Sequence, residues 1–149
     1  MGKNVINQRK ISQFLDYLVE RNIIHAGQKQ DVLNRGQEQA RHLLLDKRTE
    51  MRRIMGRKRV VYALSEIEVI ASFRFRRLDI PEELVDEECI SRIVSEEEEF
   101  PFVVLDPLQL DYRLVTDSFG GPFAERHLII TLEEDSETLT LAMAEPWNK

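Results

Sequence analysis

The chain has 149 residues with a hydrophobic fraction of 42%, which is enough apolar material for one ordinary domain or two small subdomains. Its formal net charge of −6 argues against a nucleic-acid binder. No apolar run approaches the roughly 20 residues that a membrane-spanning helix needs, and the polar start lacks the apolar centre of a signal peptide. We therefore expect a globular cytoplasmic protein, and the one cysteine, Cys89, which cannot form an internal disulfide, fits a reducing compartment.

The charges are unevenly distributed along the chain. Basic residues gather between Lys47 and Arg59, and acidic residues gather between Glu82 and Glu88 and again over residues 96–99. Each block either faces a partner or only keeps a helix surface hydrated, and hydration is the more common role of a charge run.

The first part of the chain predicts a helical hairpin. Residues 1–10 show no periodicity and are expected to form a flexible tail. From Ile11 to Val19 apolar residues recur at the spacing of one helical face, and Asn22 suits a left-handed terminator. A second helix is expected to begin after residues 25–27 and to end at Gly56. Its apolar side carries Val32, Leu33, Gly36, Ala40, Leu43, Leu44, Met51, Ile54 and Met55. Residues 11–59 are therefore predicted to form a helical subdomain.

Two more helices follow a short ambiguous run. Residues 60–64 fit either a strand or an entry segment, since periodicity cannot decide so brief a run. Ser65 and Glu68 have capping-box spacing, which predicts a helix from this point. Asp86 is placed to cap a fourth helix whose first turn is acidic, as the helix dipole favours.

Three apolar runs near the C-terminus predict a small sheet. Residues 128–132 and 139–144 are separated by a polar, mainly acidic segment, which is typical of a β-hairpin. Residues 102–105 are expected to add a third strand that stops at Pro107. Asp111 is placed to cap a short helix between these runs. The predicted class is α+β: an N-terminal helical hairpin, then a sheet of about three strands packed with helices in an α/β subdomain over residues 60–149.

No motif of catalysis or of metal or cofactor binding stands out. The sequence has no Walker glycine loop, dinucleotide glycine fingerprint, HExxH motif or paired cysteine ligands. The scattered His25, His42 and His127 fit surface or boundary positions, and Cys89 fits a packing role. Gly120 and Gly121 would suit a phosphate site or a tight turn, and Pro122, which removes a donor, favours the turn. We expect neither enzymatic activity nor a cofactor in this chain.

The second half of the chain resembles a known family. Phe100-Pro101-Phe102-Val103-Val104-Leu105-Asp106, a short helix around Leu114, residues 124–132 and then Leu139-Thr140-Leu141-Ala142-Met143-Ala144-Glu145-Pro146 are similar to the N-terminal domain of the ATPases of type II secretion and type IV pilus assembly, the general secretory pathway protein E family. The resemblance covers about residues 65–147. Residues 11–37 resemble the helical hairpin at the start of the family more weakly.

The resemblance implies an adaptor role. In that family this domain precedes an ATPase motor and docks it on the cytoplasmic part of an inner-membrane assembly component. The ATP would then be bound by the motor domain, and the chain would reach the membrane only through its protein partner. The sequence ends at Lys149, where the linker to the motor would begin, so either an excised domain or a stand-alone relative is expected.

Basic side chains are the candidate contacts for that partner, because charge complementarity steers encounter and sets orientation. The candidates are Arg52, Arg53, Arg57, Arg74, Arg76 and Arg77. The alternative function is a sensor of cyclic di-GMP or another anion. However, the dinucleotide motif of some relatives has an arginine and two glycines at positions where residues 13–37 carry other residues. A nucleic-acid binder using residues 52–59 is a third reading, disfavoured by the overall acidity.

Overall fold

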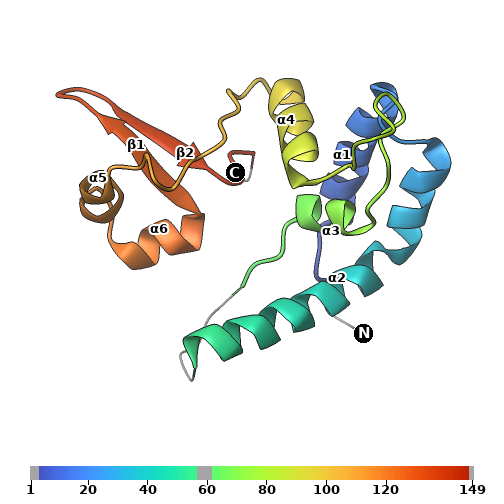
Figure 1. Cartoon of the computed structure of the whole chain (residues 1–149), viewed down its shortest axis with the longest axis horizontal. Coiled ribbons are helices and arrows are strands. Elements are labelled where there is room, and N and C mark those ends of the chain that lie inside the picture. Colours follow the sequence, from blue (N-terminus) through green and yellow to red (C-terminus); the bar gives the residue numbers. More distant parts are fainter. Residues whose placement is uncertain (1–3, 57–61, 148–149) are drawn as a thin grey trace. The chain divides into compact units, whose positions relative to one another are not determined.

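A computed structural model describes residues 4–56 and 62–147 of the chain (Figure 1). The chain forms two compact units, Met1–Glu97 and Glu98–Lys149. The sequence had placed the division between residues 59 and 60. The structure places it after α4, because the third and fourth helices contact the first two and share their core.

The first unit consists of four helices around one core. They are α1 (Gln8–Glu20), α2 (Ala26–Met55), α3 (Glu66–Ser72) and α4 (Glu87–Glu97). α1 and α3 each contact the other three helices, so both lie at the centre of this unit. The predicted apolar face of α1 is confirmed, with Ile11, Phe14, Leu15 and Leu18 buried. Asn22 has a φ of 54°, as expected for the residue that terminates this helix.

The N-terminal segment is anchored, which corrects the expected flexible tail over its described residues. Ile6 is buried at 4% exposure, and Gln37 of α2 holds the chain on both sides of it. The Gln37 amide accepts a hydrogen bond from the Val5 N–H at 3.0 Å and donates one to the Ile6 carbonyl at 2.9 Å. Asn7 then caps α1 through its side chain. One apolar side chain and a cap are enough to order this segment, although neither produces any periodicity in the sequence.

α2 is buried only in its first half. Its fully buried positions are Val32, Gly36 and Ala40, and all of them precede residue 41. Gly36 lies close to the Ile6 side chain, where an added Cβ would meet Ile6 Cδ1 at 3.5 Å. The helix ends at Gly56, whose positive φ of 67° confirms it as the predicted stop.

The caps of α3 and α4 are those the sequence predicts. Ser65 Oγ accepts the Glu68 N–H at 3.1 Å, and the Glu68 carboxylate accepts the Ser65 N–H at 2.9 Å. Asp86 accepts the Cys89 N–H at 2.8 Å at the start of α4. Of the ambiguous run 60–64, residues 60 and 61 lie outside the described part of the chain, and residues 62–64 form no strand.

The second unit is an α+β arrangement built on a hairpin. It contains α5 (Tyr112–Asp117), α6 (Gly121–His127), β1 (Ile129–Glu134) and β2 (Leu139–Met143). The strands pair antiparallel, with Ile129 opposite Met143 and Thr131 opposite Leu141, and a bulge interrupts the ladder between Thr131 and Glu133. α5 and α6 both contact β1. The predicted C-terminal hairpin and the short helix capped by Asp111 are confirmed.

The expected third strand is wrong. The described sheet has two strands, and residues 102–105 have no ladder partner in it. Val103 and Val104 of this run are exposed. Pro101 and Pro107 bracket the run and each lacks a backbone donor, so an apolar run of four residues has too few donors at its ends to extend the ladder.

Gly120 and Gly121 also differ from expectation. They begin α6: Gly120 is its N-cap with φ −57°, and Pro122 stands in the first turn. Neither glycine has a positive φ, so the left-handed freedom expected of a tight turn is not used. Pro122 fits here because the first N–H groups of a helix have no intrahelical partner to lose. Along the described chain, no helix combines the length and the apolar character needed to cross a bilayer.

Candidate docking surface

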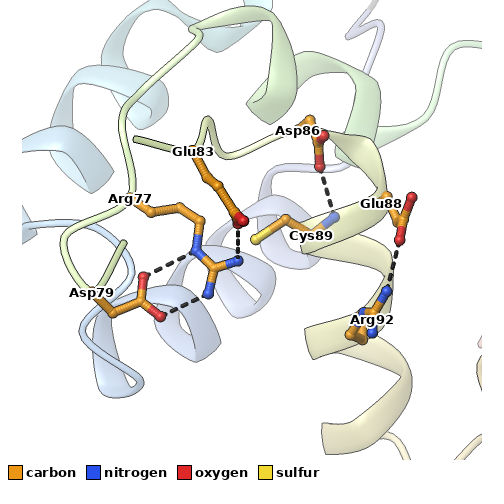
Figure 2. Close-up of polar contacts among 7 residues, drawn as sticks. All are labelled: Arg77, Asp79, Glu83, Asp86, Glu88, Cys89 and Arg92. Atoms are coloured by element: carbon orange, nitrogen blue, oxygen red, sulfur yellow. Dashed lines mark hydrogen bonds and ion pairs between the residues drawn. The ribbon is translucent and has the colours of Figure 1, made fainter. Parts of the chain in front are cut away.

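Arg77 is held by a clamp of its own loop (Figure 2). Its guanidinium donates to both Asp79 carboxylate oxygens at 2.7 and 3.0 Å, and to Glu83 at 2.9 Å. A backbone hydrogen bond also closes this loop, because the Arg77 N–H donates to the Glu83 carbonyl at 3.0 Å. The Arg77 side chain is only 19% exposed. Its hydrogen bond to Asp79 raises the pKa of Arg77, and the same bond lowers the pKa of Asp79. These contacts give Arg77 a role in shaping the loop.

The neighbouring arginines are exposed but also serve the loop. Arg76 donates to the Pro81 carbonyl at 3.1 Å and pairs with Leu84 in an isolated bridge. Arg74 follows α3 with a positive φ of 54°, the conformation that ends many helices. Its N–H donates to the Ala71 carbonyl at 3.0 Å. Of these three arginines, Arg74 has the side chain most open to a partner.

Cys89 lies beside the clamp and is not an activated thiol. Figure 2 shows its side chain directed toward the group formed by Arg77 and Glu83. Burial raises the pKa of the Cys89 thiol, and the nearby Arg77 charge opposes this only in part. A thiol that stays protonated is a poor nucleophile. The expected packing role therefore agrees with its half-buried position.

The candidate arginines form two separate groups. The loop of Arg74 to Arg77 lies beside the first half of α2, because Gln39 donates to Ser72 Oγ at 3.1 Å and the Leu78 N–H donates to the Ile23 carbonyl just before that helix. Arg52 and Arg53 lie in the last turn of α2, about 20 Å further along the helix than Gln39. Arg57 falls outside the described residues. The structure thus does not bring the five arginines that it describes into one surface.

The second half of α2 presents an apolar stripe to solvent. Figure 1 shows this half extending away from α1 and α4. The helical repeat continues the buried line of Ala40 through Leu44, Met51 and Met55, and Ile54 lies beside them. Leu44 and Met51 are half-buried, whereas Ile54 and Met55 are 70% and 45% exposed. A stripe that is core at one end and solvent-facing at the other is typical of an interaction surface.

An arginine row runs along one side of this stripe. Arg41, Arg48 and Arg52 are spaced by seven and four residues, so they share one helix face about 6 to 11 Å apart along the axis. All of them are exposed, and within the described residues no ion pair is formed by any of them. We call the stripe of Leu44, Met51, Ile54 and Met55 together with this arginine row the α2 surface.

The stripe also contains one lysine, and its other flank is acidic. Lys47, three residues after Leu44 and four before Met51, lies on the same helix face, with its Nζ 5.7 Å from the Tyr62 ring centroid, and the Tyr62 hydroxyl bonds to Glu68. Burial and the Glu68 carboxylate raise the pKa of Tyr62, so the phenol keeps its proton. Asp46 and Glu50 lie on the remaining side of the helix. The exposed apolar edge is therefore bordered by positive charge on one flank only.

The histidines do not assemble a site. His25 precedes α2 and donates its backbone N–H to Gln28 Oε1 at 2.8 Å, and His42 is exposed on α2. His127 is in the second unit, with its ring 4.4 Å from the Phe123 ring. Over residues 4–56 and 62–147, side chains of histidine, cysteine, aspartate and glutamate form no group suited to hold a metal ion.

The sequence prediction missed Arg41 and grouped the other arginines by adjacency. The signal was available, because positions 41, 48 and 52 fall on one face of a helix that the same sequence predicts. Arg53, one residue from Arg52, projects to a different side. What the sequence did not reveal is that Arg77 is engaged within its own loop.

In comparisons with known proteins, no protein-family model matches the chain, and neither does any curated protein or solved structure.

Proposed function

We propose that this chain is a non-catalytic docking module of a type II secretion or type IV pilus assembly ATPase, and that the α2 surface binds the cytoplasmic part of an inner-membrane assembly protein. The observation that carries the proposal is the exposed apolar stripe of α2 with its arginine row. An apolar centre contributes affinity, and charges at its border set orientation.

The chemistry of the α2 surface specifies the partner element. Residues 41–55 carry five basic and two acidic side chains, so an acidic partner gains electrostatic attraction here. The stripe follows one helix, which suits a second helix packed alongside it. The partner element is therefore an amphipathic helix with apolar residues at helical spacing and aspartate or glutamate beside them.

The assignment to secretion or pilus ATPases rests on sequence resemblance in the second unit. Residues 100–106 and 124–146 carry the series of apolar, proline and acidic positions that resembles the family domain. The role in tethering an ATPase motor, the cytoplasmic location and the indirect attachment to the inner membrane follow from that resemblance.

Calorimetric titration of the full chain with the cytoplasmic domain of the inner-membrane assembly protein encoded beside it tests the proposal. We expect saturable binding that weakens as the salt concentration rises, because exposed charges are screened. Absence of heat and of any complex on gel filtration at matched concentrations contradicts the docking role.

A matched pair of triple variants locates the interface. Arg41→Glu, Arg48→Glu and Arg52→Glu together reverse the arginine row and should weaken binding at least about tenfold. Arg9→Glu, Arg74→Glu and Arg113→Glu change the net charge equally at exposed positions that do not belong to the α2 surface, and should leave binding within about threefold. Equal loss in both variants would mean that only net charge matters.

Cyclic di-GMP is titrated in parallel as the test of the sensor function. The arginine row offers three guanidinium groups along a convex helix face, which by itself cannot enclose a nucleotide base, so we expect negligible heat. Saturable dinucleotide binding that the row variant abolishes would replace docking by ligand sensing.

A further inference from the structure

The outer edge of β2 is open. The Ala144 N–H donates to the Leu128 carbonyl at 3.0 Å, which makes these residues a hydrogen-bonded pair at the end of the ladder. Bonded and non-bonded pairs alternate in an antiparallel ladder, so Met143 and Leu141, opposite Ile129 and Thr131, are non-bonded pairs. The N–H and C=O groups of Leu141 and Met143 therefore point away from β1. Within the described sheet no strand lies on that side.

β2 also lacks the features that usually protect an edge strand. Its sequence, Leu-Thr-Leu-Ala-Met, contains no charge and no proline, and it carries no bulge of its own. Leu139, Leu141 and Met143 alternate along it and are 40%, 36% and 44% exposed. A neutral strand with open donors, open acceptors and a row of exposed apolar side chains is a template for a further strand.

An added strand would stabilise the second unit, because the core of this unit is small. Among its described residues, Ile129 is the one buried apolar side chain, while many others stay exposed. Two-stranded hairpins are marginal in water, and three strands or a packed helix are needed for independent stability. A third strand beside β2 would cover part of this apolar surface.

Charge identifies the kind of strand. Residues 98–149 carry eleven acidic and three basic side chains. A shallow hollow at the turn end of the hairpin is lined by Glu133, Glu134 and Asp135 together with the apolar Leu114 and Leu132. Such a hollow suits a lysine or arginine, whose aliphatic stem packs on apolar atoms while its charge meets carboxylates. Glu145 lies just beyond the other end of β2.

Asp135 is a fixed negative charge at this end. Its carboxylate accepts the Glu137 and Thr138 N–H groups, both at 2.8 Å, and the Thr138 hydroxyl at 2.5 Å. These hydrogen bonds, the hydroxyl first, lower the pKa of Asp135, so it stays ionised well into the acidic range.

We propose that β2 binds an extended partner segment by strand addition, and that this segment alternates apolar residues and carries lysine or arginine at its ends. A second copy of the chain fits less well, since pairing β2 with itself would bring together two strongly acidic units. This surface lies on a different unit from the α2 surface and does not depend on the docking function.

Titration of the full, isotopically labelled chain with short synthetic peptides tests the proposal by nuclear magnetic resonance. The probe is a peptide of alternating valine and threonine with lysines at both ends. We expect saturable shifts of the Leu139, Leu141 and Met143 amides, and slowed hydrogen exchange of the Leu141 and Met143 amides, whose N–H groups would enter a new ladder.

Two control peptides separate the contributions. The first has glutamate in place of every lysine and should bind at least about tenfold more weakly. The second keeps the lysines but has proline at its central position, which removes a donor and breaks the extended pairing, and should lose the exchange protection. Equal binding of all three peptides would overturn the proposal, as would shifts confined to other elements.

A variant of β2 tests strand addition in the protein instead of in the peptide. Leu141→Pro removes an N–H that the β1 ladder does not use, so the hairpin should persist while strand addition is lost. The Thr131 and Ala142 amide signals report whether the hairpin is intact, and if it is not, the proline peptide carries the test alone. Shifts at β2 that grow with protein concentration in the absence of peptide would show self-pairing and overturn the basic-strand partner.

Discussion

Thr131 is a buried residue whose hydroxyl is not satisfied. It lies in β1 at 2% exposure, and no described residue hydrogen-bonds to its Oγ1 atom. Thr131→Val replaces the hydroxyl by a methyl group of similar size on the same β-branched frame. We expect the free energy of unfolding of the second unit to rise by about 1 kcal/mol, because an unsatisfied buried group is removed.

Chemical denaturation followed by the fluorescence of Trp147 measures this effect, since the one tryptophan of the sequence lies in the same unit. A loss of stability in Thr131→Val would mean that the hydroxyl has a partner in solution.

Glu66 anchors the N-terminal segment to α3. Its side chain is 9% exposed and accepts the Asn7 N–H at 2.9 Å. Glu66→Ala should lower the free energy of unfolding of the first unit by about 1 to 2 kcal/mol, because the Asn7 N–H loses its acceptor.

Thermal unfolding followed by circular dichroism checks this, with Glu66→Gln as the control that keeps an acceptor oxygen in place. The amide should retain at least about half of the lost stability. Equal losses in the alanine and glutamine variants would assign the effect to charge or packing instead.

Cys89 should react slowly with thiol reagents. Burial raises its pKa, so at mildly alkaline pH a smaller fraction is thiolate than in a free cysteine. We expect alkylation by iodoacetamide to be several-fold slower than in the unfolded chain, and its rate to keep rising with pH beyond the ordinary cysteine range. A rate that matches the unfolded chain would mean an accessible, ordinary thiol.

At the scale of the element, α2 should not be uniformly stable. Its buried positions end at Ala40, so residues 45–55 depend on helix propensity and on few tertiary contacts. Native-state hydrogen exchange should be at least about tenfold faster for the amides of residues 45–55 than for those of residues 32–40. Uniform protection along α2 would mean that the exposed stripe is already covered in the free chain.

The elements that could be predicted from the sequence are those with local causes. The cap at Ser65, the stop at Gly56 and the terminator at Asn22 each depend on one residue and its immediate neighbours, and all are confirmed. The prediction of a third strand was wrong because ladder pairing is a long-range property that an apolar run of four residues cannot specify. The prediction of a flexible tail was wrong over residues 4–7, because the residues that anchor this segment, Gln37 and Glu66, are remote in sequence.

The candidate surface was predictable in kind but not in membership. The basic stretch and the helix that carries it were both visible, and projecting one on the other yields Arg41, Arg48 and Arg52 as a row. The engagement of Arg77 within its own loop could not be predicted, since Glu83 reaches it only through the fold of the loop after α3. Exposure, which separates Arg74 from Arg77, also depends on tertiary structure.

For the molecule as a whole, the charge is divided between the units. Residues 1–97 have eighteen basic and sixteen acidic side chains, whereas residues 98–149 are strongly acidic. The formal net charge of −6 therefore conceals one nearly neutral unit with a basic helix and one anionic unit with an open strand. These units offer chemically opposite surfaces, so a single change of salt or pH acts on the two in different ways.

Hydrogen exchange with and without the partner tests most directly whether the second half of α2 is a docking surface. Adding the cytoplasmic domain of the inner-membrane assembly protein to the full chain should protect the amides of residues 45–55, because packing a helix against this half suppresses its local opening. Protection confined to residues 74–84 or to the second unit, with residues 45–55 unchanged in a saturated complex, would contradict the account.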